Sequence, residues 1–201
     1  MLEDVIYRFQ YNSVVILTFF FLCLAILIID KIFKGKFINY FFVTYRGDSL
    51  LNPLTYFKLI SHSLGHADWD HLYNNFVKIL LIGPMIEEKY GSINLLIMLI
   101  LTSLVIGIIN RIFSKRGLYG ASGIAYMLIV LSSFVNIQGG KIPVTLALII
   151  LFFVVDEIIQ LLKRKKNDNI SHLGHLTGAL CGLVFGILSM KGIDLVHSII
   201  K

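Results

Sequence analysis

Long stretches without a charged residue recur along the chain and alternate with short polar connections. Windows free of Asp, Glu, Lys and Arg cover residues 9–29, 90–110, 117–140 and 169–190. Each window can cross a bilayer, since a helix needs about 20 apolar residues to span a hydrocarbon core of about 30 Å. Two further apolar windows, residues 71–86 and 142–162, contain one and two charged residues. The pattern therefore predicts six membrane-spanning helices.

The six predicted spans form one all-α transmembrane bundle that uses the whole chain, residues 1–201. We expect the spans at about residues 12–30, 69–87, 91–112, 120–137, 142–162 and 171–190. Because only short connections remain, no separate soluble domain fits beside the bundle. Residues 31–61 differ from the other connections, since they are long, mixed in polarity and rich in Tyr and Phe. They predict a structured first loop that is interfacial or re-entrant.

Composition and charge agree with an integral multi-pass membrane protein, which we expect in the cell membrane. The chain is 57% hydrophobic and 15% charged, and its mean hydropathy is +0.82. The net charge of +6 comes mainly from loop Lys and Arg, which suits anionic lipid headgroups. We expect no nucleic-acid partner, because no basic soluble surface remains to bind one. Cys23 and Cys181 both fall in predicted spans, so a disulfide framework is not expected.

Polar side chains gather at the starts of the second, fourth and sixth predicted spans. Consecutive spans alternate in direction, so these three starts lie at one depth on one side of the membrane. The segments there read HADWDHLYNNF (66–76), GASGIAY (120–126) and SHLGHLTG (171–178). Hydroxyl, imidazole and amide groups cost free energy in hydrocarbon unless they are paired or hydrated. The three starts therefore predict a polar cavity below the lipid surface.

One serine and one histidine in this cluster have the chemistry of a hydrolase. Glycines recur at every fourth position of the last span, at Gly174, Gly178, Gly182 and Gly186. Such a stripe lets helix backbones pack closely, and its expected partner is the small-residue start of the fourth span, which brings His175 to Ser122. A hydroxyl becomes a nucleophile when a hydrogen-bonded base takes its proton. The sequence predicts a Ser122–His175 dyad without an acidic third member. The acids closest to the depth of His175 in the membrane are Asp68 and Asp70 at the start of the second span, and we expect both to lie in the preceding loop.

Helical spacing supplies the supporting groups. His71 and Asn75 are four residues apart and share a helix face, so both side chains can aim a hydrogen-bond donor at one point. Ser122 and Tyr126 share a face by the same spacing. We expect the backbone N–H of Ser122 and the side chains of His71 and Asn75 to stabilise a tetrahedral oxyanion. We expect the ring of Tyr126 to orient the catalytic imidazole.

Four separated motifs resemble the rhomboid family of intramembrane serine proteases. They read HSLGHADWDHLYNN, PMIEEKYGS, GASGIAY and GHLTGALCG, and together they cover about residues 55–190. Gly120 and Gly123 frame the GxSG pattern, Gly178 closes a GHxxG pattern, and His66 opens an H-x4-H-x3-N pattern. These patterns occur in the family's order and on the matching spans, whereas GxSG alone would be unspecific.

The resemblance implies a six-span rhomboid-like bundle and an intramembrane serine endopeptidase. In that family the residues at these positions act as the nucleophile (Ser122), the general base (His175), the oxyanion donors (His71 and Asn75) and a ring stacked on the base (Tyr126). The substrates are transmembrane helices of other membrane proteins, cut near the membrane surface where small or helix-weakening residues let the helix unwind. The partners implied are these substrates and the lipid bilayer, with no cofactor and no metal. The oligomeric state is left open.

Two other functions remain open. The chain could be a non-catalytic rhomboid-like membrane protein that binds transmembrane helices without cutting them. It could also hold zinc, because histidine spacings that suit zinc occur at His62, His66 and His71 and again at His172 and His175. Against zinc, no HExxH motif is present and no Cys lies near, so we expect no metal. In the protease reading His62 and His66 brace the first loop.

The second and fifth predicted spans both carry charges, and the family is thought to admit substrate between them. We hypothesise that Lys78 pairs with Asp156 or Glu157 across this seam.

The orientation of the bundle is open, because two rules conflict. Lys and Arg number twelve in the first, third and fifth loops and five on the opposite side, so the positive-inside rule places the cavity mouth in the cytoplasm. The family topology places it outside.

Overall fold

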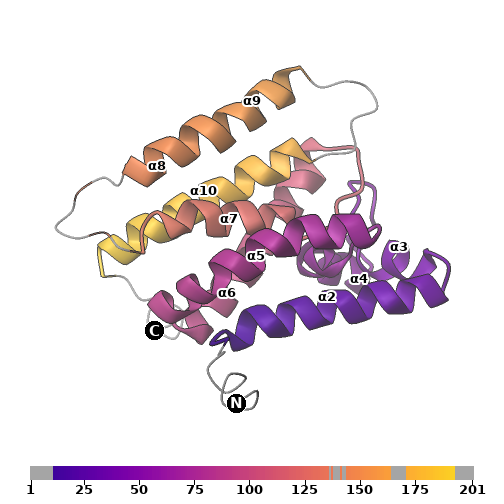
Figure 1. The fold of residues 1–201 in the computed structure, drawn as a ribbon. Coiled ribbons are helices and arrows are strands. Elements are labelled where there is room, and N and C mark those ends of the chain that lie inside the picture. The colour runs from indigo at the N-terminus through magenta and orange to yellow at the C-terminus, as the bar shows by residue number, and fades with distance from the viewer. Residues whose placement is uncertain (1–10, 136, 138–140, 142–143, 164–170, 193–201) are drawn as a thin grey trace, which may run out of the picture.

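The computed structural model of the protein describes residues 11–135, 137, 141, 144–163 and 171–192, and these residues form a bundle of helices (Figure 1). Among the described residues, four helices are long and apolar enough to cross a membrane: α2 (Val14–Ile32), α6 (Ser92–Phe113), Val144–Leu162 and α10 (His172–Met190). All four coincide with predicted spans. The all-α membrane class is therefore confirmed.

The second and fourth predicted spans depart from a simple membrane crossing. Helix α5 (Trp69–Tyr90) has 22 residues, but it carries charged residues at both ends and Lys78 within it. Helix α7 (Ser122–Ser132) has only 11 residues and ends well before the predicted boundary. Residue 136 and residues 142–143, which the predicted fourth and fifth spans include, lie outside the described residues. The count of six spans accordingly stays a prediction.

The first loop is structured, as predicted. It contains helix α3 (Lys36–Phe41), helix α4 (Pro53–Ser61) and a 3-10 turn over His62–Leu64. One cation forms an ion pair within the loop, and a second links the loop to α6. The ammonium of Lys58 lies 3.8 Å from the carboxylate of Asp48, and the guanidinium of Arg111 on α6 donates to the carbonyl oxygens of Tyr45, at 3.1 Å, and of Asp48. The loop is therefore fixed to α6 through polar contacts at the edge of the bundle.

Helix α7 lies at the centre of the bundle, between α5 and α6 on one side and α10 on the other (Figure 1). Eight of its residues are buried, and it packs most closely against α10. The predicted glycine stripe makes this contact. A Cβ at Gly182 would overlap the carbonyl oxygen of Met127, and one at Gly186 would overlap the ring of Phe134. Small residues thus let the two backbones touch, as they do in packed transmembrane helices.

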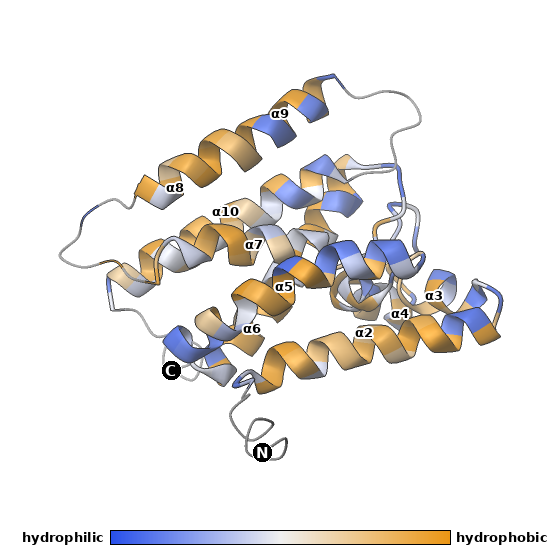
Figure 2. Cartoon of the chain, in the orientation of Figure 1, coloured by the Kyte–Doolittle hydropathy of each residue, from blue (hydrophilic) through white to orange (hydrophobic). Residues whose placement is uncertain are grey.

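The fifth predicted span lies at the edge of the bundle, where it contacts both α10 and α7 (Figure 1). It consists of α8 (Val144–Ile149), a π-helical turn (Ile150–Val154) and α9 (Val155–Leu162). Its buried side chains are Leu146 and Glu157. Figure 2 shows the orange, hydrophobic colour along α8, whereas blue residues occur on α9 and at the first turns of α5. This span therefore offers most of its apolar surface to lipid.

The buried carboxylate of Glu87 on α5 caps the N-terminus of α2. The hydroxyl of Ser13 donates to Glu87 at 2.5 Å, and the backbone N–H groups of Val15 and Ile16 donate to it at 3.1 and 3.3 Å. Ser92 adds a fourth bond of 2.6 Å from the start of α6. The first N–H groups of a helix lack partners within the helix and carry partial positive charge, which a carboxylate satisfies. Glu87 thus joins three helices at the end of the bundle opposite the polar starts.

Replacing Glu87 by alanine is expected to destabilise the bundle. The variant leaves buried donors without an acceptor, so the free energy of unfolding should fall by about 1–3 kcal/mol. Denaturant unfolding in detergent micelles measures this change. Glu88→Ala is the matched control, because the Glu88 side chain is exposed and should change little. Equal losses in the two variants would contradict the capping role.

Candidate active site

The first loop fixes the turn that leads into α7. Thr44 in the loop and Leu118 before α7 exchange two backbone hydrogen bonds of 3.1 and 3.0 Å. Two residues further on, the N–H of Gly120 donates to the carbonyl oxygen of His62 at 2.8 Å. These contacts join segments that lie more than 50 residues apart in the sequence. They hold the backbone directly before Ser122.

His66 supports the same turn through its ring. Its Nδ1 donates to the carbonyl of Leu64 at 3.3 Å, which leaves Nε2 to accept from the N–H of Ala121 at 3.4 Å. This arrangement requires a neutral ring. Burial in the protein lowers the pKa of His66 to about 3, and burial likewise lowers the pKa of His62 to about 4. Both rings are therefore uncharged at neutral pH. Through its two hydrogen bonds, His66 connects the first loop to the turn before Ser122.

Two side chains of α5 face this turn. Gly120 has a φ of +110°, and a Cβ there would lie 2.7 Å from Nε2 of His71 and 3.7 Å from the amide nitrogen of Asn75. Nδ1 of His71 accepts from the N–H of Ala67 at 3.5 Å, so Nε2 carries the proton and points toward Gly120. Asn75 is 4% exposed, and its amide nitrogen has no hydrogen-bond partner among the described residues. Two donors are therefore available beside the backbone that precedes Ser122.

Helix α10 meets α7 one residue beyond Ser122. A Cβ at Gly123 would lie 3.1 Å from the carbonyl oxygen of Gly174, and one at Gly178 would overlap the carbonyl oxygen of Gly123. Gly123 follows Ser122 directly, and Gly174 directly precedes His175. The contact that the glycine pattern predicts is thus present at the first turns of both helices. It places the serine and the histidine on adjoining turns.

The imidazole of His175 is held from two sides. Its ring stacks on the ring of Tyr126, with centroids 4.4 Å apart and planes at 9°, as the sequence predicted. Its Nδ1 lies 2.9 Å from a carboxylate oxygen of Glu157 on α9. An ionised carboxylate only accepts hydrogen bonds, so Nδ1 carries the proton. Nε2 is consequently the nitrogen that can accept a proton from elsewhere.

The expectation that His175 has no acidic partner is wrong. Glu157 supplies one from the fifth predicted span, an odd span, whereas the prediction rests on the acids near the starts of the even spans. The sequence did contain a signal, because an ionisable residue inside an apolar span marks a functional site more often than not. His172, which the sequence offers only as a possible zinc ligand, also bonds to Glu157. It precedes His175 by three residues and so shares its helix face.

The hypothesis that Lys78 pairs with Asp156 or Glu157 is also wrong. Both oxygens of the Glu157 carboxylate are occupied, since Tyr126 donates to one at 2.5 Å and His172 donates to the other at 2.6 Å. The side chain of Lys78 is exposed, and it forms no ion pair with the described part of the chain. The rotation of α9 directs Glu157 toward α10 and α7 instead of toward α5.

Glu157, His172 and His175 are the residue types that bind zinc, and their ligand atoms lie within 4.8 Å of one another. The nitrogen–oxygen distances from Glu157 to the two rings are 2.6 and 2.9 Å. Two ligands of one tetrahedral zinc ion would lie about 3.3 Å apart, because each metal–ligand bond is about 2.0–2.2 Å. The observed distances fit protons between the atoms. The cluster as it stands is a hydrogen-bonded network.

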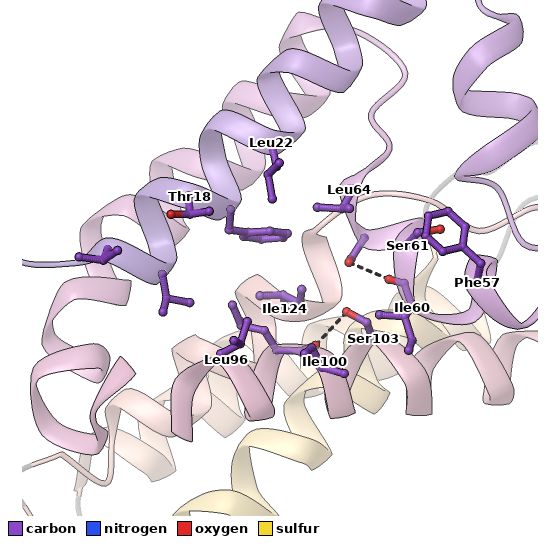
Figure 3. Close-up of a pocket in the computed structure, with 15 residues that line it drawn as sticks. Thr18, Leu22, Phe57, Ile60, Ser61, Leu64, Leu96, Ile100, Ser103 and Ile124 are labelled. Atoms are coloured by element: carbon purple, nitrogen blue, oxygen red, sulfur yellow. Dashed lines mark hydrogen bonds between the residues drawn. The ribbon is translucent and has the colours of Figure 1, made fainter. Parts of the chain in front are cut away.

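A cavity of about 490 Å³ lies away from this cluster, between α2, α4 and α6 (Figure 3). Its walls are mostly apolar side chains such as Leu22 and Ile100. The hydroxyls of Ser63 and Ser103 in its wall donate to backbone carbonyl oxygens of nearby residues. None of the predicted catalytic side chains lines it. The cavity is therefore separate from the candidate active site.

Comparison with known proteins agrees with this layout. Residues 53–192 match the family model described as the rhomboid domain. The chain is 23% identical over 149 residues to rhomboid-like protein 11, chloroplastic, of Arabidopsis thaliana, covering 68% of this chain and 53% of that protein. It is 25% identical over 137 residues to the rhomboid protease GlpG of Haemophilus influenzae, covering 67% of this chain and 70% of that protein. The chain thus spans about half the length of the first relative. Because the rhomboid family model matches more than half of the residues of this chain, the chain belongs to the rhomboid family.

Proposed function

We propose that the protein is an intramembrane serine endopeptidase that cleaves transmembrane helices of other membrane proteins. In this proposal Ser122 is the nucleophile and His175 is the general base. The observation that supports it is the fixed imidazole of His175, which stacks on Tyr126 and bonds to Glu157 through Nδ1, so that Nε2 is the nitrogen left to act as the base. A ring held this way can take a proton from a hydroxyl without first reorienting.

The chemistry follows the usual order of acyl transfer. The proton of the Ser122 hydroxyl moves to Nε2 of His175 while Oγ bonds to the scissile carbonyl carbon. Nε2 then gives that proton to the leaving amine as the carbon–nitrogen bond breaks. A water molecule attacks the resulting ester through the same base, and Ser122 regains its proton. Each step needs Nε2 to alternate between acceptor and donor, which the fixed Nδ1 proton allows.

The negative oxygen of the tetrahedral intermediate needs donors that are already in place. We assign this role to the backbone N–H of Ser122, to Nε2–H of His71 and to the amide of Asn75. The unpartnered amide of Asn75 supports the assignment, because a buried donor without a partner is costly unless it serves a ligand. The nearness of the His71 ring to Gly120, where a Cβ would lie 2.7 Å from Nε2, supports the assignment of the second donor.

The lipid bilayer is the environment of the chain, since three of the four long apolar helices among the described residues lie within the matched rhomboid domain. We infer that its substrates are single transmembrane helices, and that the membrane concerned is the cell membrane. A helical substrate must unwind before attack, because its carbonyl groups are otherwise hydrogen-bonded within the helix. Substrate segments with Gly, Ala or Ser near the membrane surface are therefore expected to be cut fastest.

Reconstitution into liposomes tests the proposal. Purified protein is mixed with a set of single-span substrates that differ in helix stability, and the products are identified by mass spectrometry. Cleavage by the wild type, absent from Ser122→Ala, is the expected result. Binding of the substrates by both proteins without any cleavage would favour a non-catalytic helix-binding protein instead.

The proposed oxyanion donor Asn75 gives a second test. Asn75→Ala should lower kcat by about 10²–10³-fold with little change in KM, since the donor acts mainly on charge that develops in the transition state. The assay measures cleavage of one substrate over a range of substrate densities in the bilayer. Asn74→Ala is the matched control, because the adjacent Asn74 side chain is exposed. A rise in KM with unchanged kcat would place Asn75 in substrate binding and not in the oxyanion hole.

A further inference from the structure

The carboxylate of Glu157 forms hydrogen bonds with three side chains of other helices, which is more than the packing of α9 requires. It is 6% exposed, and it lies on a span whose other buried side chain is Leu146. A carboxylate in the membrane is costly unless several donors compensate it, so its presence there calls for a function. The donors all belong to the candidate site. One carboxylate oxygen accepts from Tyr126 and His175, and the other accepts from His172.

The contacts of Glu157 determine both the tilt and the tautomer of His175. The ring plane is fixed by stacking on Tyr126, whose hydroxyl is itself bound to Glu157 at 2.5 Å. The tautomer is fixed because the carboxylate accepts the Nδ1 proton at 2.9 Å. His172 holds the second oxygen at 2.6 Å and so prevents the carboxylate from turning away. An imidazole without this acceptor could carry its proton on Nε2, and it could not then act as a base toward Ser122.

We propose that Glu157 is a positioning residue that completes a Glu157–His175–Ser122 triad, an inference that rests on the protease function proposed above. During attack the Ser122 proton moves to Nε2 as the oxygen–carbon bond forms, and the Nδ1 proton stays on His175. Glu157 remains a carboxylate throughout and faces the positive charge that the ring gains. When the carbon–nitrogen bond breaks, Nε2 returns its proton to the amine. No proton is transferred to Glu157, which acts only through the imidazole.

The test compares Glu157→Gln with the matched control Asp156→Asn, whose exposed side chain is adjacent in sequence. The amide of the glutamine can donate to Nδ1 and favours the wrong tautomer. We expect kcat to fall by about 10²–10⁴-fold in Glu157→Gln while KM changes little. Asp156→Asn should behave as the wild type. If the wild type is active and the Glu157→Gln variant has the same kcat as the wild type, the triad is overturned.

A spectroscopic measurement keeps the inference testable if Glu157→Gln folds poorly, because it leaves Glu157 intact. In ¹⁵N-histidine-labelled Ser122→Ala protein, the His175 signal is assigned by its loss on further replacement of His175. We expect it to show protonation at Nδ1, and protonation at Nε2 would overturn the proposal. This readout does not depend on cleavage. If His175 is protonated at Nδ1 but the wild-type protein does not cleave its substrates, the protease function alone is refuted. Loss of wild-type cleavage on adding a chelator, restored by zinc, would overturn the triad in favour of a metal site.

Discussion

Replacing Ser122 or His175 by alanine should each lower the cleavage rate by about 10⁴–10⁶-fold, and replacing both should cost no more than the more severe single change. The reason is that the two side chains act as one unit. Once the nucleophile is gone, the base has no proton to accept, and once the base is gone, the hydroxyl stays unreactive. Initial rates of cleavage in liposomes, measured for the wild type, both single variants and the double variant, give the comparison.

The control for this cycle is Ser132→Ala, the same substitution at the other end of α7. The Ser132 hydroxyl donates to the carbonyl oxygen of Ile129 and lies far along the helix from Ser122. Its activity should remain close to that of the wild type. Losses that add in the double variant would show that Ser122 and His175 act independently, which is incompatible with a shared proton transfer.

Replacing Gly178 by alanine should disrupt the contact between α7 and α10. The added Cβ would overlap the carbonyl oxygen of Gly123, which is backbone and cannot move aside as a side chain can. The two helices must therefore separate, and overpacking of this kind costs about 1–3 kcal/mol. Because the same turns carry Ser122 and His175, activity should fall together with stability. Unfolding in micelles and cleavage in liposomes measure the two effects.

Gly47→Ala is the matched control for Gly178→Ala. A Cβ at Gly47 meets nothing within 4 Å, and its φ lies outside the positive range that disfavours a side chain. Its stability and activity should stay near those of the wild type. A Gly178→Ala protein that is as stable and as active as the control would show that α7 and α10 do not need this close approach.

The sequence alone supports a large part of the fold and of the site. Charge-free windows locate α2, α6 and α10, and an apolar window with two charged residues locates the segment Val144–Leu162, since length and apolar content decide whether a helix can span a bilayer. Spacing within one helix places His71 beside Asn75, because residues four apart always share a face. The glycine stripe predicts which helix α10 touches.

Other features depend on contacts between distant segments. The bond between Gly120 and His62 and the pairing of Thr44 with Leu118 require the first loop to fold back onto α7. No local pattern specifies that arrangement. Opposite charges on neighbouring spans predict a pair of Lys78 with Asp156 or Glu157. The rotation of α9 about its own axis decides the true partner, and the apolar pattern of a lipid-facing helix does not determine that rotation.

A serine-reactive fluorophosphonate tests most directly whether α7 and α10 build a reactive hydroxyl below the lipid surface. The purified protein in a bilayer is treated with the probe, and the modified residue is located by peptide mass spectrometry. We expect one adduct on Ser122 in the wild type, none in Ser122→Ala, and much slower labelling in His175→Ala. An unlabelled wild type, or labelling that persists unchanged in Ser122→Ala, would contradict the assignment of Ser122 as the nucleophile.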